Sequence, residues 1–85
     1  MGELSALPNI GDAVEAQLNA VGVFTCGELR SLGSREAWLR IQRIDSSACI
    51  HRLLALEGAI RGVKKTDLPP EVKAELRTFY IAHRL

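Results

Sequence analysis

The sequence has 85 residues, the length of one small domain with a single modest core, and we expect residues 1–85 to form one domain. Hydrophobic residues make up 47% of the chain, which argues against intrinsic disorder, and the scarcity of aromatic residues favours packed helices over a sandwich of strands. The net charge of +1 excludes strong long-range steering by the whole molecule, and no stretch reaches the ~18 apolar residues that span a bilayer.

The first predicted elements are a short turn or helix within residues 1–6 and a helix over residues 12–20. Pro8 ends the first of them, because the residue before a proline is pushed out of the helical region. Gly11 is expected to supply backbone freedom where the chain reverses, and Gly22 is expected to stop the helix. The pattern therefore predicts a hairpin between two helical segments.

The middle of the chain contains two predicted helix starts. Thr25 with Glu28 three residues later forms a capping box, which opens a short helix that ends at Gly33. Ser34 is expected to cap the next helix, over residues 35–43. The buried face of that helix is predicted to consist of Ala37, Trp38 and Ile41.

The longest predicted helix covers residues 47–61 and is expected to be capped by Asp45, Ser46 and Ser47. Its apolar stripe, which includes Cys49, is wide enough to predict a central helix with neighbours on more than one side. Gly58 costs ~1 kcal/mol relative to Ala inside a helix, and a close helix crossing would explain it.

A loop over residues 63–66 precedes the last predicted helix, which starts within residues 67–71. Its inner face is expected to hold Val72, Leu76, Phe79 and Tyr80. The elements together predict an all-α fold of five or six short helices, arranged as a helix-hairpin-helix or SAM-like bundle.

Charge is unevenly distributed along the chain. Residues 1–29 carry four acidic side chains and no Lys or Arg, whereas residues 30–65 carry eight basic and three acidic side chains. The remainder is balanced. A basic middle segment is consistent with nucleic-acid contact, although most such segments are solvated helix faces.

The cysteines and histidines form no recognisable chemical site. Cys26 and Cys49 are 23 residues apart without CxxC spacing, and His51 and His83 complete no metal-ligand pattern with them. We expect two partly buried free thiols in a reducing compartment, with no metal and no cofactor. No residue spacing implies a nucleophile with its base, so no catalytic residues are predicted. The N-terminus has no signal-peptide pattern, and a cytoplasmic protein is expected.

Several motifs resemble one known family when taken in order. The turn Leu7-Pro8-Asn9-Ile10-Gly11, with the helix and Val21-Gly22-Val23 after it, resembles a helix-hairpin-helix element. The following motifs are Glu28-Leu29-Arg30-Ser31-Leu32-Gly33-Ser34, Glu36-Ala37-Trp38-Leu39, Cys49, Leu54-Ala55-Leu56-Glu57-Gly58-Ala59-Ile60 with Gly62, and Asp67-Leu68-Pro69 ahead of Lys73, Leu76 and Phe79-Tyr80. Residues 4–80 thus resemble the C-terminal domain of the TfoX/Sxy family of bacterial competence regulators.

The resemblance implies a domain of a transcriptional regulator of DNA uptake. The family's N-terminal domain is not among these 85 residues, so the regulation attributed to full-length members need not transfer. The loop Val63-Lys64-Lys65-Thr66 departs from many relatives, in which an aromatic residue or histidine is expected.

The predicted hairpin turn is a candidate phosphate site. A helix-hairpin-helix that binds DNA offers turn amides and a helix N-terminus to a phosphate, which here would involve Asn9, Ile10 and Gly11. This chemistry favours a second glycine and a nearby cation, but the sequence has Asn9 and the acidic residues Asp12 and Glu15. A structural turn is therefore favoured over a phosphate clamp.

Two further sets of residues are candidate contacts. Arg61, Lys64 and Lys65 surround a helix end, where they either compensate the helix dipole or bind DNA. Phe79 and Tyr80 either close the core or contact a partner.

The sequence leaves two main functional hypotheses open. The first is a non-enzymatic domain that acts through contacts with another protein, a TfoX N-terminal-type domain or a second copy of the chain. The alternative is a DNA-binding module that uses the hairpin amides and the basic middle segment. The missing catalytic set argues against an enzyme.

Overall fold

The computed structural model describes residues 2–85, and it consists of helices and their connections. The elements are η1 (Glu3–Ala6), α1 (Asp12–Ala20), α2 (Cys26–Leu32), α3 (Ser34–Ile44), α4 (Ile50–Arg61), η2 (Lys65–Asp67) and α5 (Pro70–His83), where η marks a 3₁₀ helix. The predicted all-α class with five or six short helices is confirmed. Within the described residues, no helix is long and apolar enough to cross a bilayer.

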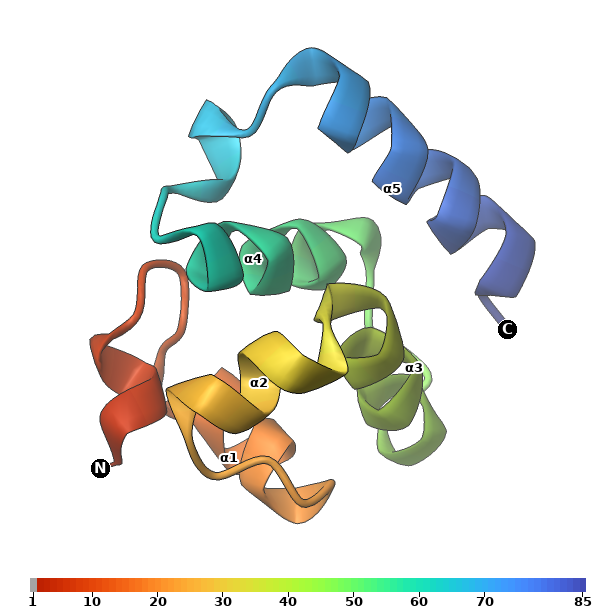
Figure 1. Ribbon diagram of the computed structural model, residues 1–85. Helices are drawn as coiled ribbons and strands as arrows, with labels where there is room; N and C mark the ends of the chain where they lie inside the picture. The colour runs from red at the N-terminus through yellow and green to blue at the C-terminus, as the bar shows by residue number, and fades with distance from the viewer. Residues whose placement is uncertain (1) are drawn as a thin grey trace.

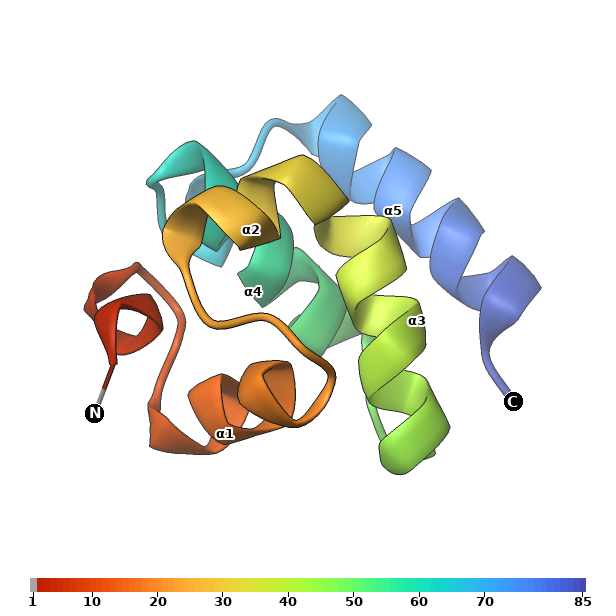
Figure 2. The same cartoon turned by 60° about the horizontal axis from the view of Figure 1, so that its bottom comes forward.

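Helix α4 is the centre of the fold, as its wide apolar stripe predicts. It contacts α2, α3, α5 and η2, and it buries Leu53, Leu54, Leu56 and Ala59. Helix α5 lies on one side of α4, and α1 and α2 lie on the other (Figure 1). Figure 2 shows α3 between these two groups, consistent with its contacts to α1, α2, α4 and α5. Burial on several sides makes α4 the scaffold for the surrounding surfaces.

Trp38 is the largest fully buried side chain and anchors α3 in the core. Ala37 and Ile41 are also fully buried, so the predicted inner face of this helix is confirmed. The indole Nε1 of Trp38 donates a hydrogen bond to the carbonyl of Cys49 at 3.2 Å.

The two cysteines differ in exposure. Cys26 is half-buried and Cys49 is exposed, so the prediction of two partly buried thiols is wrong for Cys49. Both thiols are free, as predicted.

Local sequence signals predicted two of the helices, α1 and α2, correctly. Helix α1 has the predicted bounds. The capping box of α2 is complete, since the Glu28 amide donates to Thr25 Oγ1 at 3.0 Å and the Thr25 amide donates to Glu28 Oε1 at 3.0 Å. These contacts span three residues, which is why sequence spacing reveals them.

The other two predicted caps are wrong. Ser34 is the first residue of α3 rather than its cap, and its hydroxyl donates to Glu57 Oε1 at 2.5 Å. Helix α4 begins at Ile50 rather than at residue 47, with Cys49 at the cap position. Asp45 Oδ1 instead accepts from the amide and hydroxyl of Ser47, a local turn that competes with helix capping.

Candidate functional site

The left-handed residue of the Leu7–Gly11 turn is Asn9, with φ of 70°. Gly11 has φ of −97° and ψ of −175°, an extended conformation that other residues adopt readily. The prediction that Gly11 supplies the freedom for the reversal is therefore wrong. Asn tolerates the left-handed region better than most residues do, and here it replaces the glycine of the motif.

The side chain of Asn9 joins the turn to α4 and to the segment after it, and we call this set of contacts the Asn9 junction. Its Nδ2 donates to the carbonyls of Ala55 at 3.3 Å and Val63 at 3.0 Å, and its Oδ1 accepts from the amide of Lys65 at 3.1 Å. The predicted turn and the predicted basic loop at Lys64 and Lys65, far apart in the sequence, consequently lie side by side. Both polar atoms of this side chain are engaged by backbone groups.

Gly58 provides the space for that junction. A Cβ atom at Gly58 would lie 2.6 Å from Asn9 Nδ2 and 2.7 Å from the carbonyl oxygen of Val63. The approaching groups are thus a side chain and a loop, and the expected close crossing of two helices is wrong.

The other groups around the turn also serve the fold. Ile10 is a buried core residue, whereas Gly11 is exposed at the cap position of α1. Glu15 is only 6% exposed, and its carboxylate accepts from the amides of Gly2 (3.0 and 3.1 Å) and Ser5 (3.2 Å). The amide of Gly2 lowers the pKa of Glu15, burial opposes this, and the amide of Ser5 adds to the lowering. Glu15 therefore stabilises the N-terminal turn. The interpretation of Glu15 as a carboxylate that opposes a phosphate at the hairpin is wrong, because its oxygens bind these two amides.

The three candidate cations beyond α4 have different environments. Arg61 is paired with Glu57, with Nε and Oε2 2.6 Å apart. Burial raises the pKa of Glu57, but the hydrogen bonds from Ser34 and Arg61, together with the positive charges of Arg61 and Arg35, leave this pKa below its ordinary value. Lys64 is exposed, and Lys65 is half-buried. The positive charge available to a ligand here resides on the two lysines.

Phe79 and Tyr80 lie where α5 packs on α3. Their rings meet Trp38 edge-on, with centroids 6.2 and 5.5 Å away, and both residues remain half-buried. We call the region around them the α3–α5 aromatic surface. It comprises Arg35, Phe79, Tyr80, His83 and Arg84. The Arg35 guanidinium lies 5.8 Å from the centre of the Phe79 ring, and the Arg84 guanidinium lies 5.9 Å from the centre of the Tyr80 ring. The His83 ring stacks on the Phe79 ring, with centroids 4.0 Å apart.

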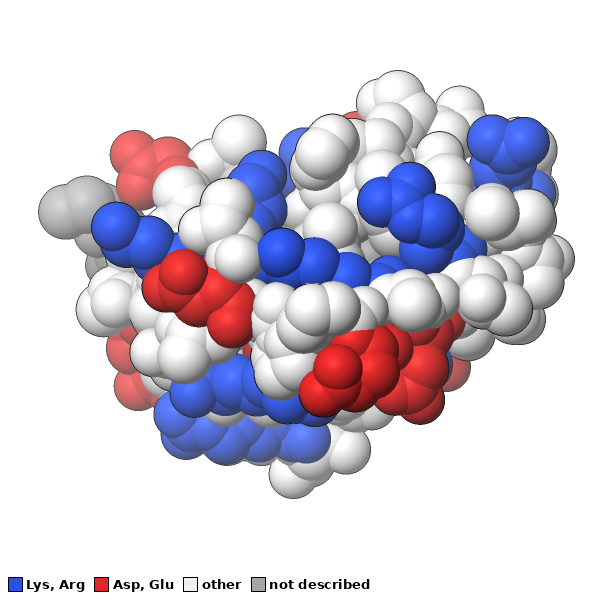
Figure 3. All heavy atoms as spheres, turned by 90° about the horizontal axis from the view of Figure 1, so that it is seen from above, with Lys and Arg blue, Asp and Glu red and all other residues white. Residues whose placement is uncertain are grey.

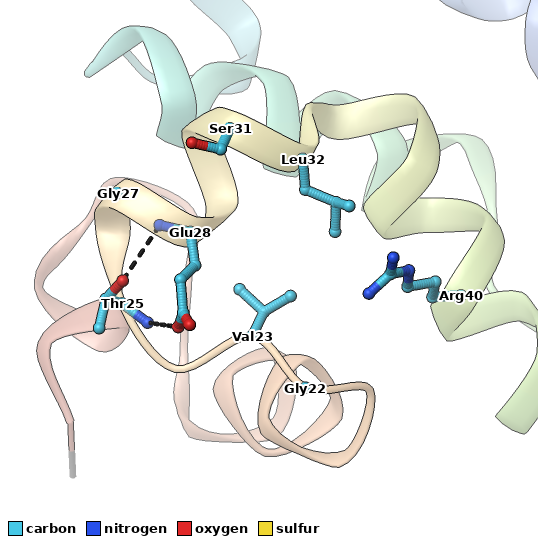
Figure 4. A pocket seen from close by; sticks show the side chains of 8 residues that line it. All are labelled: Gly22, Val23, Thr25, Gly27, Glu28, Ser31, Leu32 and Arg40. Carbon is cyan, nitrogen blue, oxygen red and sulfur yellow. Dashed lines mark hydrogen bonds between the residues drawn. The ribbon is translucent and has the colours of Figure 1, made fainter.

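A groove of about 570 Å³ lies beside α2 (Figure 4). Val23 and Leu32 point into it, and Arg40 lies across from them. Its charged side chains are engaged within the chain, since Glu28 belongs to the capping box and Arg40 pairs with Glu36 at 3.3 Å. The remaining lining residues are Gly22, Thr25, Gly27 and Ser31.

A second groove, of about 330 Å³, lies between α4, η2 and α5, and we call it the α4–α5 groove. Its lining is basic apart from a leucine and a threonine. The lining residues are His51, Leu54, Lys65, Thr66, Lys73 and Arg77.

Comparison with known proteins agrees with the family suggested by the motifs. The family model described as the TfoX C-terminal domain matches residues 1–80. The chain belongs to the TfoX C-terminal domain family. Protein Sxy of Escherichia coli (strain K12) is 38% identical over 73 residues, which are 86% of this chain and 35% of Sxy. This TfoX C-terminal domain thus spans about a third of the length of that relative.

Solved structures show the same fold. A crystal structure of an uncharacterized protein from Listeria monocytogenes, in a triclinic form, is 46% identical with a TM-score of 0.92, and covers 93% of this chain and 90% of that one. A tetragonal crystal structure of a Listeria monocytogenes protein of unknown function has a TM-score of 0.91 at 46% identity, covering 93% and 96%. This chain therefore has the same backbone fold as both Listeria monocytogenes proteins.

Sequence reasoning found only part of the polar surface of this TfoX C-terminal domain. It identified Lys65 but missed the other basic residues of the α4–α5 groove. The available signal was the spacing of Lys73 and Arg77, because residues four apart share one face of a helix. The approach of His51 to that face follows from the packing of α4 against α5, which the sequence does not reveal.

Proposed function

We propose that this TfoX C-terminal domain is a non-enzymatic interaction domain of a competence-type regulator and that it acts through protein–protein contacts. The α3–α5 aromatic surface carries this proposal. It presents two half-buried aromatic rings beside two arginines. Aromatic residues and arginine are enriched in the energetically important parts of protein interfaces.

The proposed partner is a TfoX N-terminal-type domain or another protein. The match covers about a third of Sxy, so most of that relative is available to form such a domain. In this proposal the exposed edges of Phe79 and Tyr80 are the apolar anchors. Arg35 and Arg84 favour a partner with acidic groups around the contact.

The test is an NMR titration of the labelled domain with the part of Sxy that lies outside the match, after circular dichroism has shown that this part is folded. Shifts should concentrate on the α3–α5 aromatic surface. The Arg35→Glu/Arg84→Glu variant should bind more weakly, whereas Arg30→Glu/Lys64→Glu has the same charge change on exposed sites elsewhere and should bind normally. Absence of shifts would exclude a TfoX N-terminal-type domain as the partner, and equal binding by both variants would contradict the role of the α3–α5 aromatic surface.

A second candidate function is DNA binding through the hairpin amides and the basic segment. It is favoured by the Asn9 junction, which places the Leu7–Gly11 turn beside Lys64 and Lys65. A short duplex should then bind at low salt, and Lys64→Glu/Lys65→Glu should weaken binding and flatten its salt dependence. Equal affinity of the lysine variant and the wild type would remove this surface from consideration.

A further inference from the structure

The α4–α5 groove combines an apolar floor with a basic rim. Leu54, which is 8% exposed, supplies the apolar part, and Thr66 adds a hydroxyl to the lining. His51 belongs to the first turn of α4, where the helix dipole is positive. Lys65 comes from η2, and Lys73 and Arg77 come from α5. Three elements thus bring basic groups to one depression.

No carboxylate among residues 2–85 pairs at contact distance with the cations of this groove. Among residues 2–85, the two ion pairs at contact distance are Arg40–Glu36 and Arg61–Glu57, and neither involves a residue that lines the groove. Lys and Arg side chains form a row across the face seen in Figure 3. Lys73 Nζ donates to the carbonyl of Thr66 at 3.0 Å, which holds the ammonium at the groove and leaves two of its three donors free.

We propose that the α4–α5 groove binds a phosphate monoester carried on a small organic body. A monoester has about two negative charges and three strong acceptor oxygens, which suits three neighbouring cations better than a singly charged phosphodiester does. The volume of about 330 Å³ is near the lower end for small-molecule pockets, and Leu54 offers an apolar surface to the organic part.

Two sources could supply this chemical group, namely a free small phosphate ester or the phosphorylated 5′ end of a DNA strand. The groove shares no residue with the α3–α5 aromatic surface, so the proposal stands independently of the proposed protein contact. It shares Lys65 with the second candidate function, and the experiment must therefore separate a terminal phosphate from the phosphodiester backbone.

The experiment is an NMR titration of the labelled 85-residue chain with adenosine monophosphate, with adenosine and with inorganic phosphate. Saturable shifts of the lining residues are expected with adenosine monophosphate, weaker ones with phosphate, and none with adenosine. A short duplex is then added with either 5′-phosphate or 5′-hydroxyl ends. A groove response only to the phosphorylated duplex supports the DNA end as a source, and a response to adenosine monophosphate alone supports a free ester.

The deciding variant is Lys73→Gln/Arg77→Gln, which removes two groove cations and leaves Leu54 in place. The apparent Kd for adenosine monophosphate should rise by about tenfold or more, because each charge-assisted hydrogen bond is worth more than a neutral one. The control Arg30→Gln/Arg43→Gln makes the same charge change at exposed sites outside the groove and should bind normally. Equal weakening by both variants, an equal response to adenosine, or an equal groove response to both duplexes would overturn the proposal.

Discussion

The Leu7–Gly11 turn and the α4–α5 groove both lie next to Lys65, but they use their polar groups differently. In the turn, both polar atoms of the Asn9 side chain are bonded to backbone groups of the same chain. In the groove, Lys65, Lys73 and Arg77 face no carboxylate at contact distance within residues 2–85. The Asn9 side chain of the turn is thus used to hold the fold together, whereas the groove has charges left for a ligand.

The difference has a physical basis. A polar group with complete internal hydrogen bonds gains little from an external ligand, because binding would first break those bonds. Like charges gathered around one depression repel one another, and an anion relieves that repulsion. The comparison therefore predicts that changes at the turn reduce stability and that changes at the groove leave it nearly unaltered.

The largest effect is expected for Asn9→Ala. This change removes three hydrogen bonds of about 1 kcal/mol each and places Ala in the left-handed region at a further cost, so we expect a loss of about 3–5 kcal/mol. Urea unfolding followed by circular dichroism measures it. Asn9→Gly retains the backbone freedom and should recover only the smaller, conformational part of the loss. Wild-type stability of Asn9→Ala would show that the junction is not structural.

Gly58→Ala should have the next largest effect. The added methyl group would lie 2.6 Å from Asn9 Nδ2 and 2.7 Å from the Val63 carbonyl oxygen, both of which are fixed by the junction. Overpacking of this kind costs roughly 1–3 kcal/mol, and it also disturbs the Asn9 hydrogen bonds. The combined cost should exceed the ~1 kcal/mol that Ala gains over Gly in helix propensity. Thermal unfolding of Gly58→Ala alone and combined with Asn9→Ala measures the coupling. Strictly additive losses would contradict a shared junction.

The accuracy of the sequence predictions depends on how far apart the interacting residues are. The capping box of α2 spans three residues, and the inner face of α3 follows from helical periodicity, so both were predictable. Asn9 instead reaches Ala55, Val63 and Lys65, which lie 46 to 56 residues away. Ser34 similarly bonds Glu57 instead of capping its own helix.

The same limit applies to the candidate sites. Sequence reasoning selected the turn because its residues are adjacent in the chain and fit a motif. It missed most of the α4–α5 groove, because three elements contribute its basic residues. Only the spacing of Lys73 and Arg77 on one helix was available as a local signal.

Glu15→Gln tests the N-terminal side of the turn through its pH dependence. The folded-state pKa of Glu15 is lowered by the amide of Gly2 above all, so its ionised form stabilises the fold above the ordinary pKa of 4.5. That contribution is lost as the pH falls through the lowered pKa. Wild type should therefore be more stable than Glu15→Gln at pH 7, and the difference should shrink below pH 4.5. The exposed Glu75→Gln serves as the control in urea unfolding at each pH, and a pH-independent difference would contradict this role of the carboxylate.

The smallest effect on stability is expected at the groove, for Lys73→Gln/Arg77→Gln. Both side chains extend from the surface of α5, and the one hydrogen bond lost, from Lys73 to the Thr66 carbonyl, is exposed. Its loss is offset by relief of repulsion among the groove cations, so the free energy of unfolding should change by less than about 0.5 kcal/mol. Measured beside Asn9→Ala under identical conditions, this variant separates the two regions directly. A loss as large as that of Asn9→Ala would mean that these cations are also needed for the fold, and the contrast between the turn and the groove would disappear.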